Sequence, residues 1–122
     1  MPRLILDETR IHPAVREQVA HAHVEVVHNV QSATQSHPVL VVGMAGNPFC
    51  RKARKQLQAA GVAHHYLEFG SYFNQWRTRN ALKMWTGWPT FPMVFVKGAL
   101  VGGSDDLGRL IQSGELKRLL GE

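Results

Sequence analysis

The stretch Trp88-Pro89-Thr90-Phe91-Pro92, followed by Val101-Gly102-Gly103-Ser104-Asp105-Asp106, decides the fold of this chain. The first segment places a proline directly before a short apolar run, which predicts a strand that begins at a fixed turn. The second segment leads through two glycines into a helix N-terminus, where free backbone N–H groups favour an anion. Together the two segments predict a site for a small anionic molecule between a strand start and a helix start.

The hydrophobic pattern along the chain predicts alternating helices and strands. Helical spacing of apolar residues after Pro13 predicts one long amphipathic helix over 12–34. The apolar run 39–42 predicts a buried strand, and the segment 48–60 predicts a helix that Gly61 ends. The other predicted elements are a strand over 62–68, a helix over 73–84, a hairpin of strands 93–96 and 99–101, a helix opening at Asp105 or Asp106, and a last helix ending near Leu120.

This order of elements predicts an α/β fold of the thioredoxin-like type. A parallel strand pair joined by a helix precedes an antiparallel hairpin, and helices flank both faces of such a sheet. We therefore expect a four-stranded mixed sheet with an additional N-terminal helix. The 122 residues suffice for one hydrophobic core, so we expect an N-terminal helical extension over 1–36 and a single domain over 37–122.

The composition is that of a soluble globular protein, with 44% hydrophobic and 19% charged residues. No apolar run approaches the roughly 20 residues that cross a bilayer, and the early acids Asp7 and Glu8 do not fit a signal peptide. The single cysteine allows no intrachain disulfide and fits a reducing compartment. We therefore expect a cytoplasmic protein that is a monomer or a weak dimer and has no membrane partner.

The net charge of +5 includes one local cluster of cations at Arg51, Lys52, Arg54 and Lys55. We interpret the cluster first as a solvated helix face, then as an attraction for a small anion, and only last as a nucleic-acid surface. No metal site is predicted, because His21, His23 and His28 include no pair at i, i+4 spacing.

The loop 43–48 feeds the start of a predicted helix, which is where backbone N–H groups would stabilise a reactive thiolate. Asn47 stands at this position, where it is suited to cap the helix but cannot attack a disulfide. Cys50 follows about one helical turn later, so we expect it to be half-buried. Two interpretations of Cys50 stay open, a small packing residue or a thiol with redox chemistry.

The chain resembles the glutaredoxin family over nearly its whole length. The segment Asn47-Pro48-Phe49-Cys50-Arg51-Lys52-Ala53 is similar to the family's Cys-Pro-[Tyr/Phe]-Cys active site, with the first cysteine replaced by Asn47. The segments 79–92 and 96–105 are more similar to the monothiol branch, with its Trp-Pro-Thr-[Phe/Ile]-Pro run. The lysine that the family carries ahead of the active-site loop is missing, since Met44 or Ala45 stands there.

The resemblance implies a glutathione site. It places the glycyl carboxylate on two basic residues of one helix face and the cysteinyl part on backbone beside a cis proline. It places the γ-glutamyl end at a helix start, where N–H groups take the carboxylate and an aspartate takes the ammonium. The matching residues, in that order, are Arg79 and Lys83; Thr90, Phe91 and Pro92; and Gly103, Ser104 and Asp105.

Three functions follow from this resemblance. The first is a redox enzyme that binds glutathione and removes it from glutathionylated proteins by thiol–disulfide exchange, with Cys50 as the catalytic residue. The second is a non-catalytic module that binds glutathione or a protein partner. The third is an iron–sulfur cluster carrier that uses Cys50 and glutathione in a dimer, for which one displaced cysteine per chain is a poor start.

Overall fold

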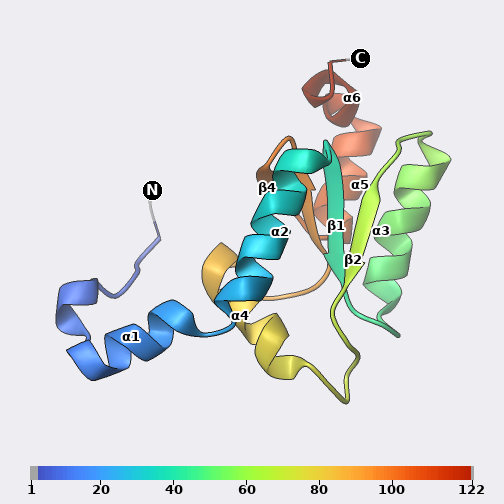
Figure 1. The fold of residues 1–122 in the computed structure, drawn as a ribbon. Coiled ribbons are helices and arrows are strands. Elements are labelled where there is room, and N and C mark those ends of the chain that lie inside the picture. Colours follow the sequence, from blue (N-terminus) through green and yellow to red (C-terminus); the bar gives the residue numbers. More distant parts are fainter. Residues whose placement is uncertain (1–2, 122) are drawn as a thin grey trace.

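The computed structural model describes residues 3–121. A central sheet lies between two layers of helices, and one short helix stands apart from this body (Figure 1). None of the helices in the described range is long and apolar enough to cross a membrane. In chain order, the elements are η1 (Glu8–Arg10), α1 (Pro13–His21), α2 (Val24–Ser36), β1 (Val39–Gly43), α3 (Pro48–Ala59), β2 (His65–Glu68), α4 (Trp76–Thr86), β3 (Met93–Val96), β4 (Ala99–Gly102), α5 (Ser104–Gln112) and α6 (Glu115–Leu119).

The sheet has four strands in the order β2-β1-β3-β4. The strand β1 pairs with β2 in parallel and with β3 antiparallel, and β3 pairs antiparallel with β4. This is the mixed sheet of a thioredoxin-like fold, as the sequence predicts. The helix α3 provides the crossover that a parallel neighbour requires, and the two-residue turn Lys97-Gly98 closes the hairpin.

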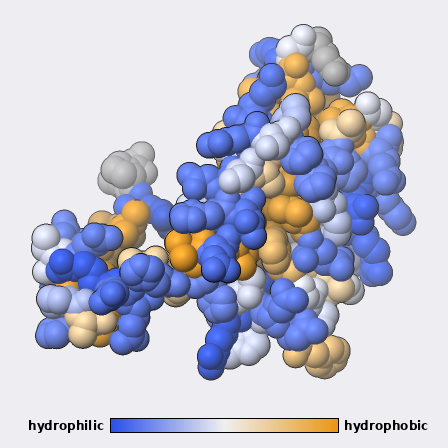
Figure 2. All heavy atoms as spheres, viewed as in Figure 1, coloured by the Kyte–Doolittle hydropathy of each residue, from blue (hydrophilic) through white to orange (hydrophobic). Residues whose placement is uncertain are grey.

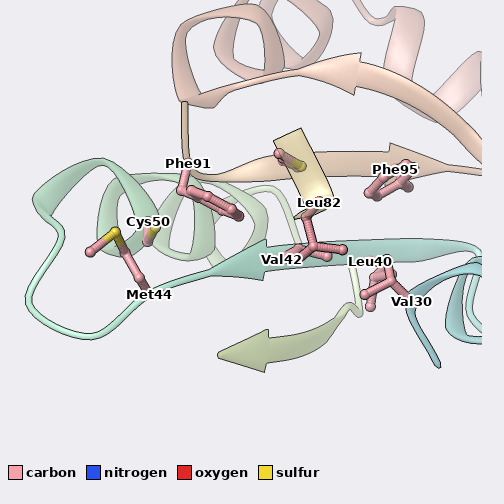
Figure 3. Close-up of a cluster of buried hydrophobic side chains, with 9 residues drawn as sticks. Val30, Leu40, Val42, Met44, Cys50, Leu82, Phe91 and Phe95 are labelled. Atoms are coloured by element: carbon pink, nitrogen blue, oxygen red, sulfur yellow. The ribbon is translucent and has the colours of Figure 1, made fainter. Parts of the chain in front are cut away.

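The two faces of the sheet bury different residues of β1. Leu40 and Val42 point to the face covered by α2 and α4, where they join Val30 and Leu82 (Figure 3). Val39 and Val41 belong to the opposite cluster. That cluster draws its helical side chains from α3, α5 and α6: Ala53, Leu57, Leu107 and Leu116. Because side chains alternate along a strand, an unbroken apolar run serves a sheet that is buried on both faces.

The prediction of one long helix over 12–34 is wrong, because the segment forms two helices. Ala22 is extended and His23 adopts the left-handed region at φ 49°, which ends α1 and starts α2 in a new direction. The helix α2 packs on the sheet, whereas α1 buries none of its residues (Figure 1). Figure 2 shows α1 as a mostly hydrophilic projection from the body. A periodic apolar pattern predicts helical structure, but it does not show whether the segment forms one continuous helix or two.

Two further boundaries differ from the predicted ones by three residues. The strand β2 begins at His65 rather than at residue 62, because Val62 donates its N–H to the Leu57 carbonyl after the end of α3. The helix α4 begins at Trp76 rather than at residue 73, because Gln75 is left-handed at φ 54°. The segment between β2 and α4 contains a turn, in which Ser71 and Asn74 form an isolated bridge.

One valine on α2 and one on α1 provide a matched test of the difference in burial between these two helices. Val30→Ala should lower the free energy of unfolding by about 2 kcal/mol, because it empties part of the core. Val19→Ala removes the same atoms from an exposed helix and should change that free energy by less than about 0.5 kcal/mol. Urea unfolding of both variants measures the difference. Equal losses would contradict the exposed position of α1.

Candidate functional site

A groove of about 290 Å³ lies where the segment before β3 meets the start of α5. It unites parts of the chain that are far apart in sequence, including the first turn of α3. The residues that line it are Phe49, Trp88, Thr90, Phe91, Pro92, Gly103, Ser104, Asp105 and Asp106. Six of the eight residues that the resemblance assigned to a glutathione site therefore lie together, and Arg79 and Lys83 are the other two.

Phe91 lines the groove although only 6% of the residue is exposed. The Phe91–Pro92 peptide bond is cis, as predicted. The Phe91 ring is buried in the core cluster that also contains Met44, Cys50 and Leu82 (Figure 3). Within residues 3–121, neither the N–H nor the carbonyl of Phe91 forms a backbone hydrogen bond. One residue before β3, the chain thus offers a free donor and a free acceptor to an extended ligand.

The start of α5 supplies free backbone donors and one exposed carboxylate. The Gly103 N–H donates to Asp106 Oδ2 at 3.0 Å, and Arg109 Nη2 donates to Asp106 Oδ1 at 2.6 Å, so Asp106 is engaged within the helix. Asp105 is exposed, and its only close cation in the described chain is Lys52, with Nζ 3.4 Å from Oδ1. The N–H groups of the first turn, at Ser104 and after, have no partner inside the helix and favour an anion.

Trp88 supplies an unsatisfied donor to the same groove. Its Nε1 atom is buried and has no hydrogen-bond partner among the described residues. This nitrogen lies 3.8 Å from the position that a Cβ atom on Gly103 would occupy, so it faces the start of α5. A buried N–H without a partner costs free energy, which a ligand with an acceptor oxygen at this point would recover.

The two basic residues assigned to the glycyl carboxylate have separate environments. Arg79 is only 7% exposed, and its Nη1 donates to the carbonyls of Phe69 at 2.9 Å and Asn74 at 2.7 Å. It thereby braces the loop between β2 and α4. The ammonium of Lys83 lies 5.8 Å from the centre of the Phe91 ring, and Lys83 is not among the residues that line the groove.

Asn47 caps α3, as the sequence predicts. Its Oδ1 accepts hydrogen bonds from the N–H groups of Phe49 at 2.8 Å and Cys50 at 3.1 Å. Its Nδ2 donates to the hydroxyl of Tyr72 at 3.4 Å, which connects the start of α3 to the loop that Arg79 braces. The side chain is buried, and both of its polar atoms are engaged.

Cys50 is fully buried rather than half-buried, with 1% of its surface exposed. Burial raises the pKa of its thiol, the charge of Glu68 raises it further, and a hydrogen bond from the Met44 backbone opposes these effects. The sulfur packs with Met44 and Phe91 in the core (Figure 3). Inert structural thiols have such surroundings, whereas reactive thiols are exposed and have a lowered pKa. Residues 3–121 hold no cluster of three potential metal ligands among His, Cys, Asp and Glu.

Three lining residues had no ligand role in the sequence interpretation: Phe49, Trp88 and Asp106. Phe49 carries a usable signal, since it is a large apolar residue directly after a predicted N-cap and proline, where a helix begins at the protein surface. Asp106 carries one as well, because three residues after Gly103 is the position from which an acid caps a helix. For Trp88 the sequence offers no sign that its ring N–H lacks a partner.

Known proteins provide an independent comparison. The family profile that matches the chain, over residues 39–101, is glutaredoxin. A glutaredoxin-like protein from Dictyostelium discoideum is 46% identical over 94 residues, which cover 77% of this chain and 76% of that protein. Monothiol glutaredoxin-4 from Schizosaccharomyces pombe is 30% identical over 98 residues, which cover 79% of this chain and 40% of that protein.

Solved structures agree with the observed topology. Oxidised glutaredoxin 2 from Chlamydomonas reinhardtii superimposes with a TM-score of 0.70 and 29% identity, over 82% of this chain and 94% of that one. A buckwheat glutaredoxin solved as a complex with glutathione gives a TM-score of 0.71 at 23% identity, over 83% and 92% of the two chains. The second likeness concerns the fold alone.

The burial of Cys50 predicts slow modification of the folded protein. At pH 8, iodoacetamide should alkylate Cys50 at least about a hundredfold more slowly in buffer than in 8 M urea, because the thiol reacts only after local opening. Intact mass reports the reaction directly, since the sequence holds one cysteine. Similar rates in the two solvents would show an accessible thiol and contradict the burial.

Proposed function

Because this chain belongs to the glutaredoxin family, we propose that it binds glutathione in the groove between the cis-proline segment and α5. One observation carries the proposal. The groove unites a free backbone donor and acceptor at Phe91, free N–H groups at the start of α5 and the exposed carboxylate of Asp105. A tripeptide with two carboxylates, one ammonium and a central cysteine has the complementary groups.

Each end of the tripeptide has a partner of the right charge. The γ-glutamyl carboxylate accepts hydrogen bonds from the first-turn N–H groups of α5. The ammonium pairs with the carboxylate of Asp105, which gives up its weak, exposed contact with Lys52. The glycyl carboxylate lies toward Lys83, the cation beside the Phe91 ring. Direct contact of Arg79 with glutathione stays a prediction, since its guanidinium donates to two loop carbonyls.

We propose further that the natural chain is a binding module and not a thiol–disulfide oxidoreductase. Exchange requires an accessible thiolate that attacks a disulfide sulfur. Cys50, the only cysteine of the sequence, is buried and has a raised pKa. Asn47, at the N-cap where a thiolate would be stabilised, has no nucleophilic atom. The single reduced thiol suits the cytoplasm, which is the compartment we propose.

The residues present do not fit an iron–sulfur cluster. Cluster iron binds thiolates, and each chain offers only Cys50, which is buried in the core cluster that includes Met44 and Phe91. Exposing this sulfur to a shared cluster would require the start of α3 to leave the core. The proposed function therefore involves no cluster.

The glutathione site predicts a specific effect of charge at Lys83. Lys83→Gln should weaken reduced glutathione binding by about two- to fivefold, the range for an ion pair that solvent reaches, in a calorimetric titration at low salt. Lys117→Gln removes the same charge from α6 and is the control. An equal loss in both variants would indicate a general charge effect and count against the assigned carboxylate position.

The altered helix start predicts a gain of function. Asn47→Cys places a thiol at the N-cap and frees the N–H groups of Phe49 and Cys50 to stabilise its thiolate. The introduced thiolate would attack a protein–glutathione disulfide, take the glutathionyl group and release the protein thiol. A second glutathione then takes that group as oxidised glutathione. We expect activity at least about tenfold above that of the natural chain.

The control for this gain is Asn47→Ser, which keeps a good N-cap but adds no thiol. It should fold and stay as inactive as the natural chain in the same assay with reduced glutathione and a glutathionylated peptide. If Asn47→Cys folds and remains inert while reduced glutathione binds, the sulfur of the ligand does not lie at the start of α3. If reduced glutathione does not bind at all, the proposed function is wrong.

A further inference from the structure

We propose that the groove selects glutathione whose sulfur carries an apolar substituent, a thioether S-conjugate, over free glutathione. The inference rests on the proposed function and names its ligand more closely. It follows from three features of the surface beside the expected sulfur position: a helix start without free donors, exposed aromatic rings, and a braced loop that holds one of these rings.

The start of α3 is the part of the protein that faces the cysteinyl position. A ligand paired with the backbone of Phe91 lies opposite this helix start, because Phe49 lines the same groove and Cys50 contacts the cluster that holds the Phe91 ring. The sulfur of the cysteinyl part therefore points toward the first turn of α3.

Every donor of that first turn is already engaged. Pro48 has no N–H group. The N–H groups of Phe49 and Cys50 donate to Asn47 Oδ1, and that of Arg51 donates to the Asn47 carbonyl at 3.3 Å. A thiolate at this point would find no free backbone hydrogen bond, and a disulfide would find no exposed nucleophile. The surroundings favour a neutral sulfur that does not react, which is the chemistry of a thioether.

Two aromatic side chains flank this helix start and remain largely open to solvent. Phe49 lines the groove and is 55% exposed, and Tyr72 is 62% exposed beside Asn47, with its hydroxyl 3.4 Å from Nδ2. Their rings offer an apolar surface that a thiol hydrogen cannot cover. An alkyl or aryl group on the ligand sulfur would cover it and remove apolar surface of both molecules from water.

The loop that carries Tyr72 is held in place before any ligand arrives. Arg79 donates to two of its carbonyls, Asn74 Oδ1 accepts the Ser71 N–H at 2.9 Å, and Ser71 Oγ accepts the Phe73 N–H at 3.2 Å. A fixed loop loses little conformational entropy on binding, so its ring contributes more of its burial to affinity. This is also a role for Arg79 that needs no direct ligand contact.

Calorimetric titration with three defined probes tests the inference: reduced glutathione, S-methylglutathione and S-benzylglutathione. We expect S-benzylglutathione to bind at least about tenfold more tightly than reduced glutathione, a difference of about 1.4 kcal/mol. S-methylglutathione should lie between them. If reduced glutathione binds and the benzyl conjugate binds no more tightly, the inference is wrong and the proposed function stands. If none of the three binds, both are wrong.

Variants test which rings contact the benzyl group. For each variant we compare the affinity for S-benzylglutathione with that for S-methylglutathione, because this ratio cancels effects on the shared glutathione part. Phe49→Ala and Tyr72→Ala should each lower this ratio by about threefold or more, whereas Tyr72→Phe keeps the ring and should preserve it. Lys55→Ala, on the outer face of α3, is the matched control. A ratio that survives both alanine substitutions in folded protein would overturn the inference. Circular dichroism checks folding, and both aromatic positions are exposed enough to tolerate the change.

Discussion

The burial of β1 on both faces is the constraint on which the rest of this structure depends. Its residues are almost without solvent contact, so each face of the strand must be covered by helices that the flanking segments supply. Packing α3 and α5 on one face, and pairing β3 with β1, brings the start of both helices and the turn before β3 to one end of the sheet. The groove lies where these three segments meet.

A second interaction, the cap formed by Asn47, decides the chemistry at that end. The same backbone N–H groups that would stabilise a thiolate are satisfied by a neutral amide, so the helix start holds no unpaired donor and no nucleophile. The thiol that follows it in sequence is turned into the core, where low polarity raises its pKa. Recognition and reaction are thereby separated: the surfaces that suit a peptide ligand persist at Phe91 and α5, beside a helix start that cannot react.

The sequence predicted most of the fold because its signals are local. The apolar run of β1, the hairpin around Lys97-Gly98 and the N-cap at Asn47 each follow from neighbouring residues. The division of the first helix does not, because His23 in the left-handed region interrupts a pattern whose spacing continues on both sides. Nor does the burial of Arg79, since a basic residue on a helix gives no sign that carbonyls of a preceding loop will surround it.

The sequence by itself determined the order of the elements from β1 onward, the cis-proline turn, the cap of α3 and the family, because propensity, periodicity and motif spacing are properties of short segments. Only the tertiary structure decided which candidate residues face the groove. Thr90 and Asp105 do, Lys83 lies near the Phe91 ring, and Cys50 and Arg79 are buried. The physical reason is that burial and hydrogen-bond partners depend on segments distant in sequence, and these set whether a thiol is reactive or a cation is free.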